Sequence, residues 1–403
     1  MSEWKKVRLG DEVAVITKGT TPRCEYVFKD DEGAVIFLRA ENIDNGIVGG
    51  SSFKYIPEHI HHKELRRSIL NEGDILITIA GAIGRVALVT PSYLPANINQ
   101  AIAIIRLESA ELDGCYLKYF LSCPLTQELL LSISSGQSVQ ANLNLQQISD
   151  LEISLPPLPT QRKIAAVLGA LDDKIENNRK ICANLEAQAQ AIFKSWFVDF
   201  EPFGGKMPQG WKEVPLSSIA TYLNGLAMQK YRPSDDEDSL PVLKIKELRQ
   251  GFCDSASERC SASIDPRYVI HDGDVIFSWS GSLLVDFWCG GTAGLNQHLF
   301  KVYSDKYDKW FVYSWTNHYL ASFIKIAADK ATTMGHITRD HLDDAKVCIP
   351  FDSDIEQVGR VMKPLYDEII TKRIESRVLA ATRDALLPKL MSGEIDVERV
   401  KVA

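Results

Sequence analysis

The sequence lacks an apolar run that would cross a membrane, and its first residues lack the apolar core of a secretion signal. Apolar stretches such as Ile75–Ala80 and Ala101–Ile105 are short and fall well below the ~18 residues of a membrane span. Residues 1–6 carry two lysines and a glutamate instead of a hydrophobic segment. These absences argue against a membrane protein and predict a cytoplasmic one.

Paired cysteines and metal-ligand spacings are also missing. The eight cysteines are dispersed without a C-x-x-C pair, so we expect reduced and mostly structural thiols. His59, His61 and His62 form the only histidine cluster, and no cysteine or H-E-x-x-H pattern accompanies them. We expect a polar loop at these histidines, no metal site and no cofactor.

Catalytic signatures are absent as well. The sequence contains no G-x-x-x-x-G-K-[ST], G-x-S-x-G, G-x-G-x-x-G or H-E-x-x-H motif. Leu155–Leu158 does not match the Asn/Asp-Pro-Pro-aromatic loop of adenine methyltransferases. Asp172–Asp173 and Asp235–Asp238 are expected to be surface acids of a helix and a loop. The chain is therefore expected not to be an enzyme by itself.

Positive charge is scarce. The chain has 45 Lys and Arg against 53 Asp and Glu, a net charge of −8. Residues 1–155 carry 14 basic against 19 acidic side chains, and residues 206–350 carry 16 against 18. Because nucleic-acid binding usually needs a basic surface, DNA binding would require a local basic patch or a partner that supplies positive charge.

The two halves of the sequence resemble each other. The matched pairs are Trp4–Leu9 with Trp211–Leu216, Phe37–Arg39 with Val242–Lys244, Asn71–Ile77 with His271–Phe277, Asn99–Gln100 with Asn296–Gln297, and Ile148–Pro156 with Leu342–Pro350. The offset falls steadily along the chain, from 207 to 205, 200, 197 and 194. Chance matches would scatter, whereas small loop deletions in a duplicated fold produce such a drift.

The first ~155 residues alternate short β-type runs with turn residues. The expected strands lie in Ala34–Leu38, Asp74–Ile79, Arg85–Val89 and Ile98–Leu107, and a helical stretch spans Leu112–Ile133. The proline-rich segment Leu155–Pro159 then marks a boundary. We predict an α+β fold with two pseudo-repeated globular domains, each containing mixed β-sheets.

Two long helices are predicted to follow the two globular domains. Apolar residues recur in a heptad seam, given by Ile164, Leu168, Leu171, Ile175, Asn178, Cys182, Leu185, Ala189, Ile192 and Trp196. The second seam is Val358, Met362, Leu365, Ile369, Lys372, Ser376, Leu379, Arg383, Leu386 and Leu390. We expect a kink at Pro364 and a helix end at Pro388.

The obvious partner of each long helix is the other one. Ile164–Trp196 would extend over ~50 Å, which is more than one small domain covers. An antiparallel coiled coil would bury both seams, and Asn178 against Lys372–Arg383 would fix the register. In the alternative, each helix packs only on its own domain.

The order of domain, helix, domain and helix resembles the specificity subunit of type I restriction-modification systems. The motifs that carry the resemblance are Gly19–Pro22, Glu72–Ile75, Gly81–Arg85, Asn97–Gln100, Leu155–Pro159 and Gln161–Ile164 followed by Leu168, Leu171 and Ile175. The second repeat departs from the pattern, because Leu226 and Ala227 follow Gly225 and no counterpart of Gly84-Arg85 is present at Leu284-Val285.

The resemblance implies two target-recognition domains, residues 1–157 and 206–352, that each read one half of a bipartite double-stranded DNA target. The helical segments 158–205 and 353–403 would set the unread spacing. Two methyltransferase subunits and two restriction/translocase subunits would bind the chain, methylate adenine N6 and cleave DNA. These partners would also supply the missing positive charge. The alternative is a protein-protein scaffold that does not read bases.

Polar loop residues are the candidates for DNA contacts, because Arg suits guanine and Asn or Gln suits adenine. In the first domain they are Thr20, Thr21, Arg23, Arg39, Arg85, Gln137, Ser138, Gln140 and Asn142. In the second domain they are Lys244, Ser280, Ser282, Lys330, Thr332, Thr333 and His336. Ordinary loop polarity is the alternative for each. Asn99, Gln100, Asn296 and Gln297 would either tie backbone together or contact bases.

Overall fold

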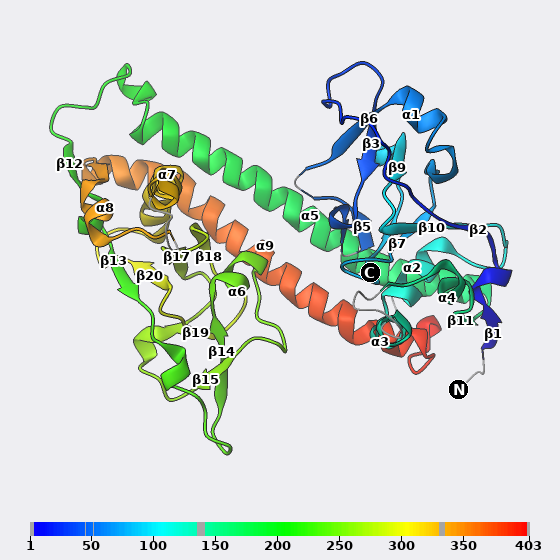
Figure 1. Cartoon of the computed structure of the whole chain (residues 1–403). Helices are drawn as coiled ribbons and strands as arrows, with labels where there is room; N and C mark the ends of the chain where they lie inside the picture. Colours follow the sequence, from blue (N-terminus) through cyan, green and yellow to red (C-terminus); the bar gives the residue numbers. More distant parts are fainter. Residues whose placement is uncertain (1–3, 45, 51, 135–141, 330–334, 401–403) are drawn as a thin grey trace. The chain divides into compact units, whose positions relative to one another are not determined.

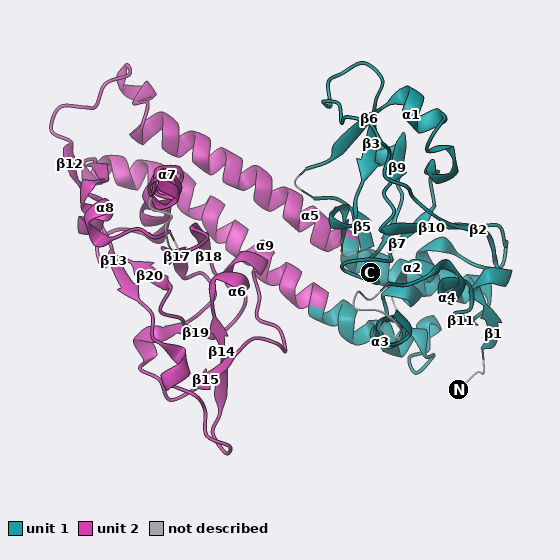
Figure 2. Cartoon of the chain, viewed as in Figure 1, with its two compact units in different colours: residues 1–172, 381–403 teal, residues 173–380 magenta. Residues whose placement is uncertain are grey.

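The computed structural model describes residues 4–44, 46–50, 52–134, 142–329 and 335–400 (Figure 1). Contacts divide the chain into two compact units (Figure 2), of which unit 1 comprises residues 1–172 and 381–403 and unit 2 comprises residues 173–380. Each long helix contributes to both units. The sequence predicts four parts, residues 1–157, 158–205, 206–352 and 353–403, which differ from these two contact units because they were defined by expected role. This four-part division stays a prediction.

Unit 1 contains a six-stranded mixed sheet of order β2-β10-β7-β8-β5-β4, a three-stranded sheet of order β6-β3-β9 and the pair β1-β11. Strand β5 runs parallel to β8, and β3 runs parallel to β9. The strands are β1 (Lys5–Arg8), β2 (Val13–Lys18), β3 (Ala34–Leu38), β4 (Ile43–Asp44), β5 (Gly46–Val48), β6 (Lys54–Pro57), β7 (Ile75–Thr78), β8 (Val86–Leu88), β9 (Ala96–Ile98), β10 (Ile102–Leu107) and β11 (Glu152–Leu155).

The shorter helices of unit 1 are α1 (Glu58–His62), α2 (Gly114–Ser122), α3 (Pro124–Ser134) and α4 (Leu145–Ser149). Helices α2 and α4 pack on the larger sheet, whereas α1 packs on β6 and β3 of the smaller one. The predicted helical stretch Leu112–Ile133 is therefore two helices, and Pro124 begins the second, as proline suits a first helical position. Ile75, Ile105 and Leu117 share one apolar cluster with Leu168 of the first long helix.

Unit 2 contains the sheets β13-β20-β17-β18 and β15-β14-β19-β16 and the pair β12-β21. Its strands are β12 (Lys212–Pro215), β13 (Thr221–Asn224), β14 (Ser239–Leu243), β15 (Arg259–Ser261), β16 (Val269–Ile270), β17 (Val275–Ser278), β18 (Leu284–Phe287), β19 (Ala293–Leu295), β20 (Leu299–Tyr303) and β21 (Lys346–Ile349). Its shorter helices are α6 (Ile245–Gln250), α7 (Lys309–Asp329) and α8 (Arg339–Asp344).

The strand order confirms the predicted duplication. The order β13-β20-β17-β18 repeats β2-β10-β7-β8, and β12-β21 repeats β1-β11. The parallel pair β14-β19 likewise repeats β3-β9, with Leu243 opposite Leu295 and Leu38 opposite Ile98. The single helix α7 stands where unit 1 has α2 and α3, because no proline interrupts it.

The two long helices are α5 (Leu158–Phe197) and α9 (Asp352–Met391), each of 40 residues. Each begins six residues before the predicted start of its seam. Pro159 lies within the first turn of α5, where a missing N–H removes no helical bond. Helix α9 begins with Asp352 and Asp354, whose charge suits a helix N-terminus.

Within unit 2 the helices pair in antiparallel order. Asn178 Nδ2 of α5 donates to Glu375 Oε2 at 3.0 Å and to Ser376 Oγ at 3.3 Å. One turn later in α5, the Cys182 thiol lies 3.7 Å from the carbonyl oxygen of Ile369, which is earlier in α9. The prediction that Asn178 meets the polar stretch of the second seam is confirmed, and Asn178 is fully buried.

Within unit 1 the other ends of α5 and α9 also meet. Arg383 of α9 pairs with Asp172 of α5 at 2.8 Å. Asp172 accepts a bond from the Tyr119 hydroxyl at 2.6 Å, so it is an anchor between elements and not the plain surface acid that the sequence predicted. Leu168 and Leu390 join the apolar cluster of this unit. The helices thus pair with each other and pack on the globular parts.

Arg373 of α9 joins α5 to the sheet of unit 2. Its guanidinium lies 2.6 Å from both Glu186 of α5 and Asp286 of β18. Burial disfavours the charge, but the two carboxylates outweigh it and raise the pKa of Arg373. Arg377, one turn on, pairs with Asp272 at 2.8 Å. These two arginines fix α9 to the globular part of unit 2.

Three further local predictions were wrong. The expected strand Ile98–Leu107 is split between β9 and β10, because Asn99 turns the chain and accepts a backbone bond from Ile102 at 3.3 Å. The histidines 59–62 lie on α1 instead of a loop, and His61 is buried against Asn97. Helix α9 passes Pro388 and ends at Met391, because burial of the last residues outweighs one lost hydrogen bond.

The described residues contain neither a membrane-spanning helix nor a candidate metal-binding cluster. In the described ranges, no helix has the length and apolar content that crossing a bilayer requires. The same ranges hold no group of histidine, cysteine, aspartate and glutamate side chains arranged to bind a metal ion. None of the eight cysteines, which all lie in the described ranges, forms a disulfide, and five of them are buried.

Candidate nucleic-acid interface

Loops from several strands converge at the same place in each unit. We call residues 19–22, 39, 79–81, 99–101 and 142–143 the first loop cluster, and residues 225–226, 244, 279–282, 296–298 and 335–337 the second loop cluster. In unit 1, the N–H of Asn99 donates to Leu38 O at 2.9 Å, and the N–H groups of Ile79 and Leu143 donate to Ala101 O at 2.8 Å and Ile79 O at 2.9 Å. Backbone bonds thus hold the cluster together.

The second loop cluster repeats these backbone bonds. The N–H of Asn296 donates to Leu243 O at 3.2 Å, and the N–H of Ile337 donates to Trp279 O at 3.0 Å. The isolated bridge between Ser280 and His336 matches the bridge between Ala80 and Asn142 in unit 1. The duplication therefore extends from the strands to the loops that present polar side chains.

The paired glycines Gly19 and Gly225 explain one motif of the sequence. A Cβ added to Gly19 would lie 2.1 Å from Ile98 O and 2.3 Å from Asn99 O. A Cβ added to Gly225 would lie 2.3 Å from Asn296 O and 2.4 Å from Leu295 O. Only glycine lets these segments pass so close to the next turn, and this contact sets the position of Thr20 and Thr21.

A second motif, Gly-Asp before β7 and β17, is structural. Asp74 Oδ1 accepts a bond from Arg106 Nε at 2.7 Å, and Asp274 pairs with Lys301 at 2.8 Å. The bond with Asp74 raises the pKa of Arg106. Gly73 lies within the turn that the N–H of Asp74 closes on Asn71 O, and its φ is 81°. This motif connects neighbouring strands of each sheet and lies outside the loop clusters.

Four of the sequence-predicted candidates come together in the first loop cluster: Thr20, Thr21, Arg39 and Asn142. Thr20, Thr21 and Asn142 are exposed. The Thr21 hydroxyl donates to Gln100 Oε1. Arg39 is half-buried and pairs with Glu41, so its charge is largely offset locally. The cluster therefore presents mainly neutral hydrogen-bonding groups.

Two further arginines of unit 1 lie apart from the cluster. Arg23 is exposed and follows residues 19–22 of the first loop cluster. Arg85 directly precedes β8, and its Nη1 lies 3.5 Å from Ile43 O. Arg85 also lines a pocket of about 430 Å³ together with Lys118, Asp172 and Arg383. Arg23 and Arg85 are therefore not part of the first loop cluster, and their proposed DNA contacts stay a prediction.

In unit 2 the candidates Lys244, Ser280, Ser282 and His336 lie in the second loop cluster. Lys244 pairs with Glu258, as Arg39 pairs with Glu41 in unit 1. Ser280 is 3% exposed, and its hydroxyl lies 3.1 Å from His298 Nδ1, so it faces the interior of the cluster. Ser282 is half-buried and His336 is exposed. The remaining candidates lie outside the described residues: Gln137, Ser138, Gln140, Lys330, Thr332 and Thr333.

Sequence reasoning left Trp279 and His298 out of the candidates. Trp279 Nε1 donates to Asn224 Oδ1 at 3.0 Å, and its ring stacks on Phe300 with centroids 5.7 Å apart. The rings of His298 and His336 lie 6.1 and 6.3 Å from that of Trp279. The duplication could have indicated them. The repeat aligns Trp279 with Ile79, His298 with Ala101 and His336 with the candidate Asn142.

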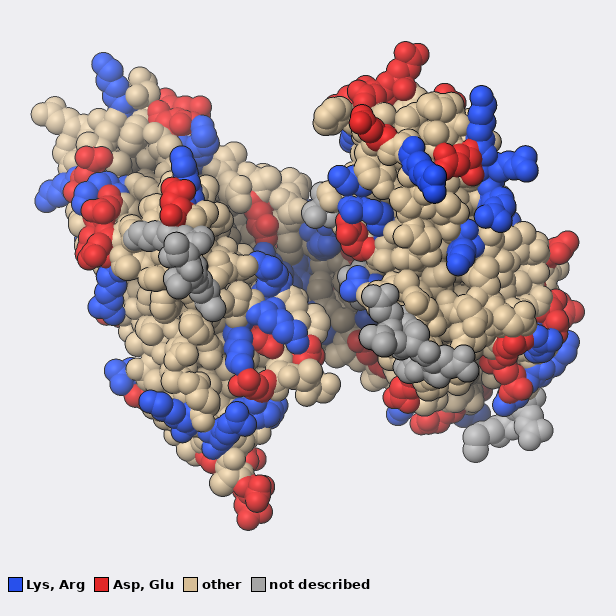
Figure 3. Space-filling model, in the orientation of Figure 1, with Lys and Arg blue, Asp and Glu red and all other residues tan. Residues whose placement is uncertain are grey.

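Charge does not mark either cluster as a nucleic-acid surface by itself. Figure 3 shows basic and acidic side chains interspersed over the visible face of each unit, and neither unit is uniformly basic in this view. This pattern agrees with the net charge of −8. Strong phosphate binding by the chain alone is therefore not expected.

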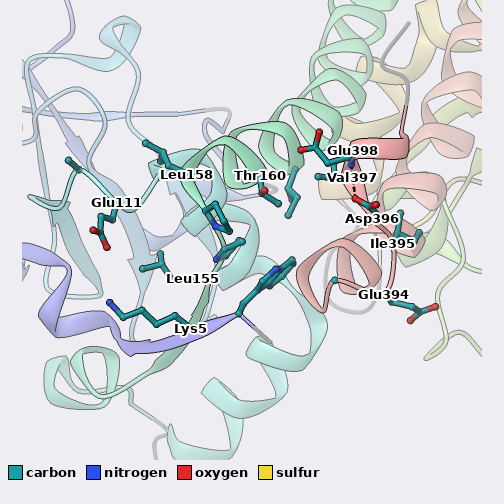
Figure 4. A pocket seen from close by; sticks show the side chains of 16 residues that line it. Lys5, Glu111, Leu155, Leu158, Thr160, Glu394, Ile395, Asp396, Val397 and Glu398 are labelled. Carbon is teal, nitrogen blue, oxygen red and sulfur yellow. Dashed lines mark hydrogen bonds between the residues drawn. The ribbon is translucent and has the colours of Figure 1, made fainter. Parts of the chain in front are cut away.

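A pocket of about 1050 Å³ in unit 1 has a different chemistry (Figure 4). Trp4, Leu158 and Val397 contribute apolar surface, whereas Glu111 and Glu394 contribute acidic groups. The labelled acids come from the loop before α2 and from the C-terminal segment (Figure 4). An acidic lining repels phosphate, so this pocket suits a protein segment better than DNA.

Unit 2 fills the equivalent space with aromatic rings. Trp211, the counterpart of Trp4, lies 6.1 Å from Phe200 and 5.2 Å from Phe203 between ring centroids. Its Nε1 donates to Asp354 Oδ2 at 3.2 Å. No aromatic residue follows Tyr366 in the sequence. The segment after α9 therefore lacks the rings that the segment after α5 provides.

A family model and the related proteins that match this sequence all carry descriptions of type I restriction specificity. Residues 1–187 match the family model described as type I restriction modification DNA specificity domain. The MjaIX specificity subunit of Methanocaldococcus jannaschii is 28% identical over 358 residues, which cover 84% of this chain and 81% of that protein. The HindI specificity subunit of Haemophilus influenzae is 21% identical over 473 residues, which cover 98% of this chain and 100% of that protein.

A solved structure shares the fold. The crystal structure of the type I restriction-modification S subunit from M. genitalium matches with a TM-score of 0.58 and 15% sequence identity, over 96% of each chain. At this identity the match concerns the fold alone. It agrees with two duplicated α+β units joined to long helices.

Proposed function

Because the chain belongs to the family of type I restriction specificity subunits, we propose that it reads a bipartite double-stranded DNA target with its two loop clusters. The observation that carries this proposal is one loop framework, built twice with the same backbone bonds, that presents different side chains in each unit. A shared framework with divergent side chains suits two different half-sites.

The recognition domains would be residues 1–157 and 206–352, and the segments 158–205 and 353–403 would set the number of unread base pairs. The continuous helices α5 and α9 support this role, because a 40-residue helix does not stretch or shorten as a loop does. Arg373 and Arg383 support it further, since each ties α9 to α5, through Glu186 and Asp172 respectively.

Catalysis would come from partners. Two methyltransferase subunits would methylate adenine N6 at the site that the chain selects, and two restriction/translocase subunits would cleave the DNA. These partners would close around the duplex and supply the positive charge that the chain lacks. The complex would work in the cytoplasm beside chromosomal DNA.

The acidic pocket of unit 1 is a candidate contact for a methyltransferase subunit. Its mixed apolar and acidic lining suits an apolar residue flanked by lysine or arginine. The double variant Glu111→Lys with Glu394→Lys is expected to weaken co-purification of the methyltransferase with the chain. Full retention of the methyltransferase would remove the pocket from that interface.

A binding selection tests the proposed function. The purified complex of the chain with its methyltransferase subunits is incubated with a library of randomised duplexes, and bound sequences are recovered. We expect two short conserved blocks separated by a fixed number of unconstrained base pairs. Recovery of the unselected library would contradict the proposal and favour the scaffold alternative, which the acidic pocket and the net charge support.

A further inference from the structure

Each loop cluster contains an Asn-Gln pair in the turn between two strands, Asn99-Gln100 in unit 1 and Asn296-Gln297 in unit 2. The asparagine side chains accept hydrogen bonds from the backbone of the same turn. Asn99 Oδ1 accepts from the N–H of Ala101 at 3.1 Å, and Asn296 Oδ1 accepts from the N–H of His298 at 3.2 Å. The N–H of Asn99 donates to Leu38 O at the end of β3, and the N–H of Asn296 donates to Leu243 O at the end of β14. The asparagines are therefore turn formers.

The glutamines lie differently. Gln100 is exposed and Gln297 is half-buried. Gln100 Oε1 accepts from the Thr21 hydroxyl, and Gln297 Nε2 lies 3.4 Å from His298 Nε2. A primary amide offers two donor and two acceptor positions. One contact thus orients each amide and leaves three positions for another molecule.

The surroundings hold both side chains in place. Gly19 lies against the carbonyl of Asn99, which positions Thr21 beside Gln100. In unit 2, His298 is held by Ser280 at 3.1 Å and lies near the ring of Trp279. A side chain fixed before binding loses less conformational entropy when it forms a specific contact.

We infer that Gln100 and Gln297 are the corresponding base-reading side chains of the two units, each recognising an adenine in the major groove of its own half-site. This inference rests on the proposed function. An amide held at one edge pairs with adenine N6 and N7 through its remaining acceptor and donor, which is the contact that glutamine makes best with a base edge. Thr21 positions the first amide, and His298 on Trp279 positions the second.

Mapping of N6-methyladenine across the genome tests this inference. Cells carry the full complex with the wild-type chain, Gln100→Ala or Gln297→Ala. We expect each variant to relax one base position in one half of the motif by about tenfold or more in preference, and the two variants to affect opposite halves. Gln100→Glu and Gln297→Glu are expected to shift that position from adenine toward cytosine, because a carboxylate accepts from cytosine N4.

Two further variants separate positioning from folding. His298→Ala is expected to relax the same position as Gln297→Ala, and His298→Asn, which keeps a polar nitrogen, to restore part of the preference. Gln357→Ala is the matched control, since Gln357 is exposed on α9 outside both clusters, and it should leave both halves unchanged. Melting temperatures of the purified chains verify that each variant is folded.

The outcomes are distinct. A bipartite wild-type motif that neither glutamine variant alters would overturn the inference and leave the proposed function standing. Relaxation of the same half by both variants would also overturn it, because the glutamines would then not be corresponding readers. A wild-type chain that directs no bipartite methylation would contradict the proposed function, and the inference with it.

Discussion

Asp272 and Arg377 connect the globular part of unit 2 to α9 through one ion pair, whose side chains are 26% and 32% exposed. Burial alone would raise the pKa of Asp272, but the bond from Arg377 lowers it. Asp272→Asn is expected to lower the free energy of unfolding by ~1 kcal/mol at pH 7. Denaturant unfolding of this variant measures the loss, and Asp305→Asn, at an exposed loop position, is the control.

The same pair predicts the direction of a pH dependence. A carboxyl whose pKa is lower in the folded state stabilises the fold above its unfolded pKa of about 3.9, and this contribution is lost as the pH falls through the folded pKa. The difference in stability between wild type and Asp272→Asn should therefore be constant from pH 7 to about pH 5 and shrink below pH 4. A difference that grows toward acid pH would contradict this assignment.

Gly19 provides a second test at single-residue scale. Gly19→Ala places a methyl group about 2 Å from two carbonyl oxygens, and overpacking of this kind costs ~1–3 kcal/mol. Thermal unfolding should show the loss. Gly49→Ala, whose Cβ would meet only the far end of Ile47 at 3.9 Å, should leave stability nearly unchanged. Equal stability of the two variants would show that the close approach does not constrain the loop.

Single residues were predicted unevenly from the sequence. The partner region of Asn178 was predictable, because a polar residue in an apolar seam needs a polar neighbour at the same level. The roles of Ser280 and His298 were not, since the residues are 18 apart and only the strand pairing brings them together. Polarity alone also selected Ser280, although burial turns it away from the surface.

At the scale of elements, the heptad pattern located both long helices but not their first turns. The seam begins only where α5 and α9 can pack, whereas the helices begin earlier, next to proline and aspartate residues that suit a helix start. The split of Ile98–Leu107 was missed because its residues are apolar on both sides of a turn. Strand content is readable from composition, but a tight turn depends on the bond that Asn99 makes.

Asn178 gives a prediction for the helix pair. Its Nδ2 has two partners, but its Oδ1 is buried without one. Asn178→Leu removes an unsatisfied buried oxygen and adds apolar contact, so we expect stability to rise by ~1 kcal/mol. Thermal unfolding checks it, with Asn177→Leu at an exposed position as control. A fall in stability for Asn178→Leu alone would show that the bonds to Glu375 and Ser376 outweigh the buried oxygen.

At the scale of the whole molecule, the chain consists of two repeated units and two continuous helices that contribute to both. The repeat and the helices were predictable from the sequence, because both leave periodic signals. The loop clusters were predictable only in part, since they form from segments that lie far apart in the chain. The net charge of −8 remains consistent with a reader that binds DNA together with partners.

The most direct test of two readers joined by a spacer changes the helices and leaves both units intact. One seam repeat of seven residues is inserted between Asp172 and Asp173 and another between Ala380 and Ala381, where the chain passes from one unit to the other. Each insertion adds ~10 Å of helix, about 3 base pairs at 3.4 Å each. Genome-wide methylation mapping should then show both half-motifs unchanged and the gap between them longer by about that number. An unchanged gap would contradict the account.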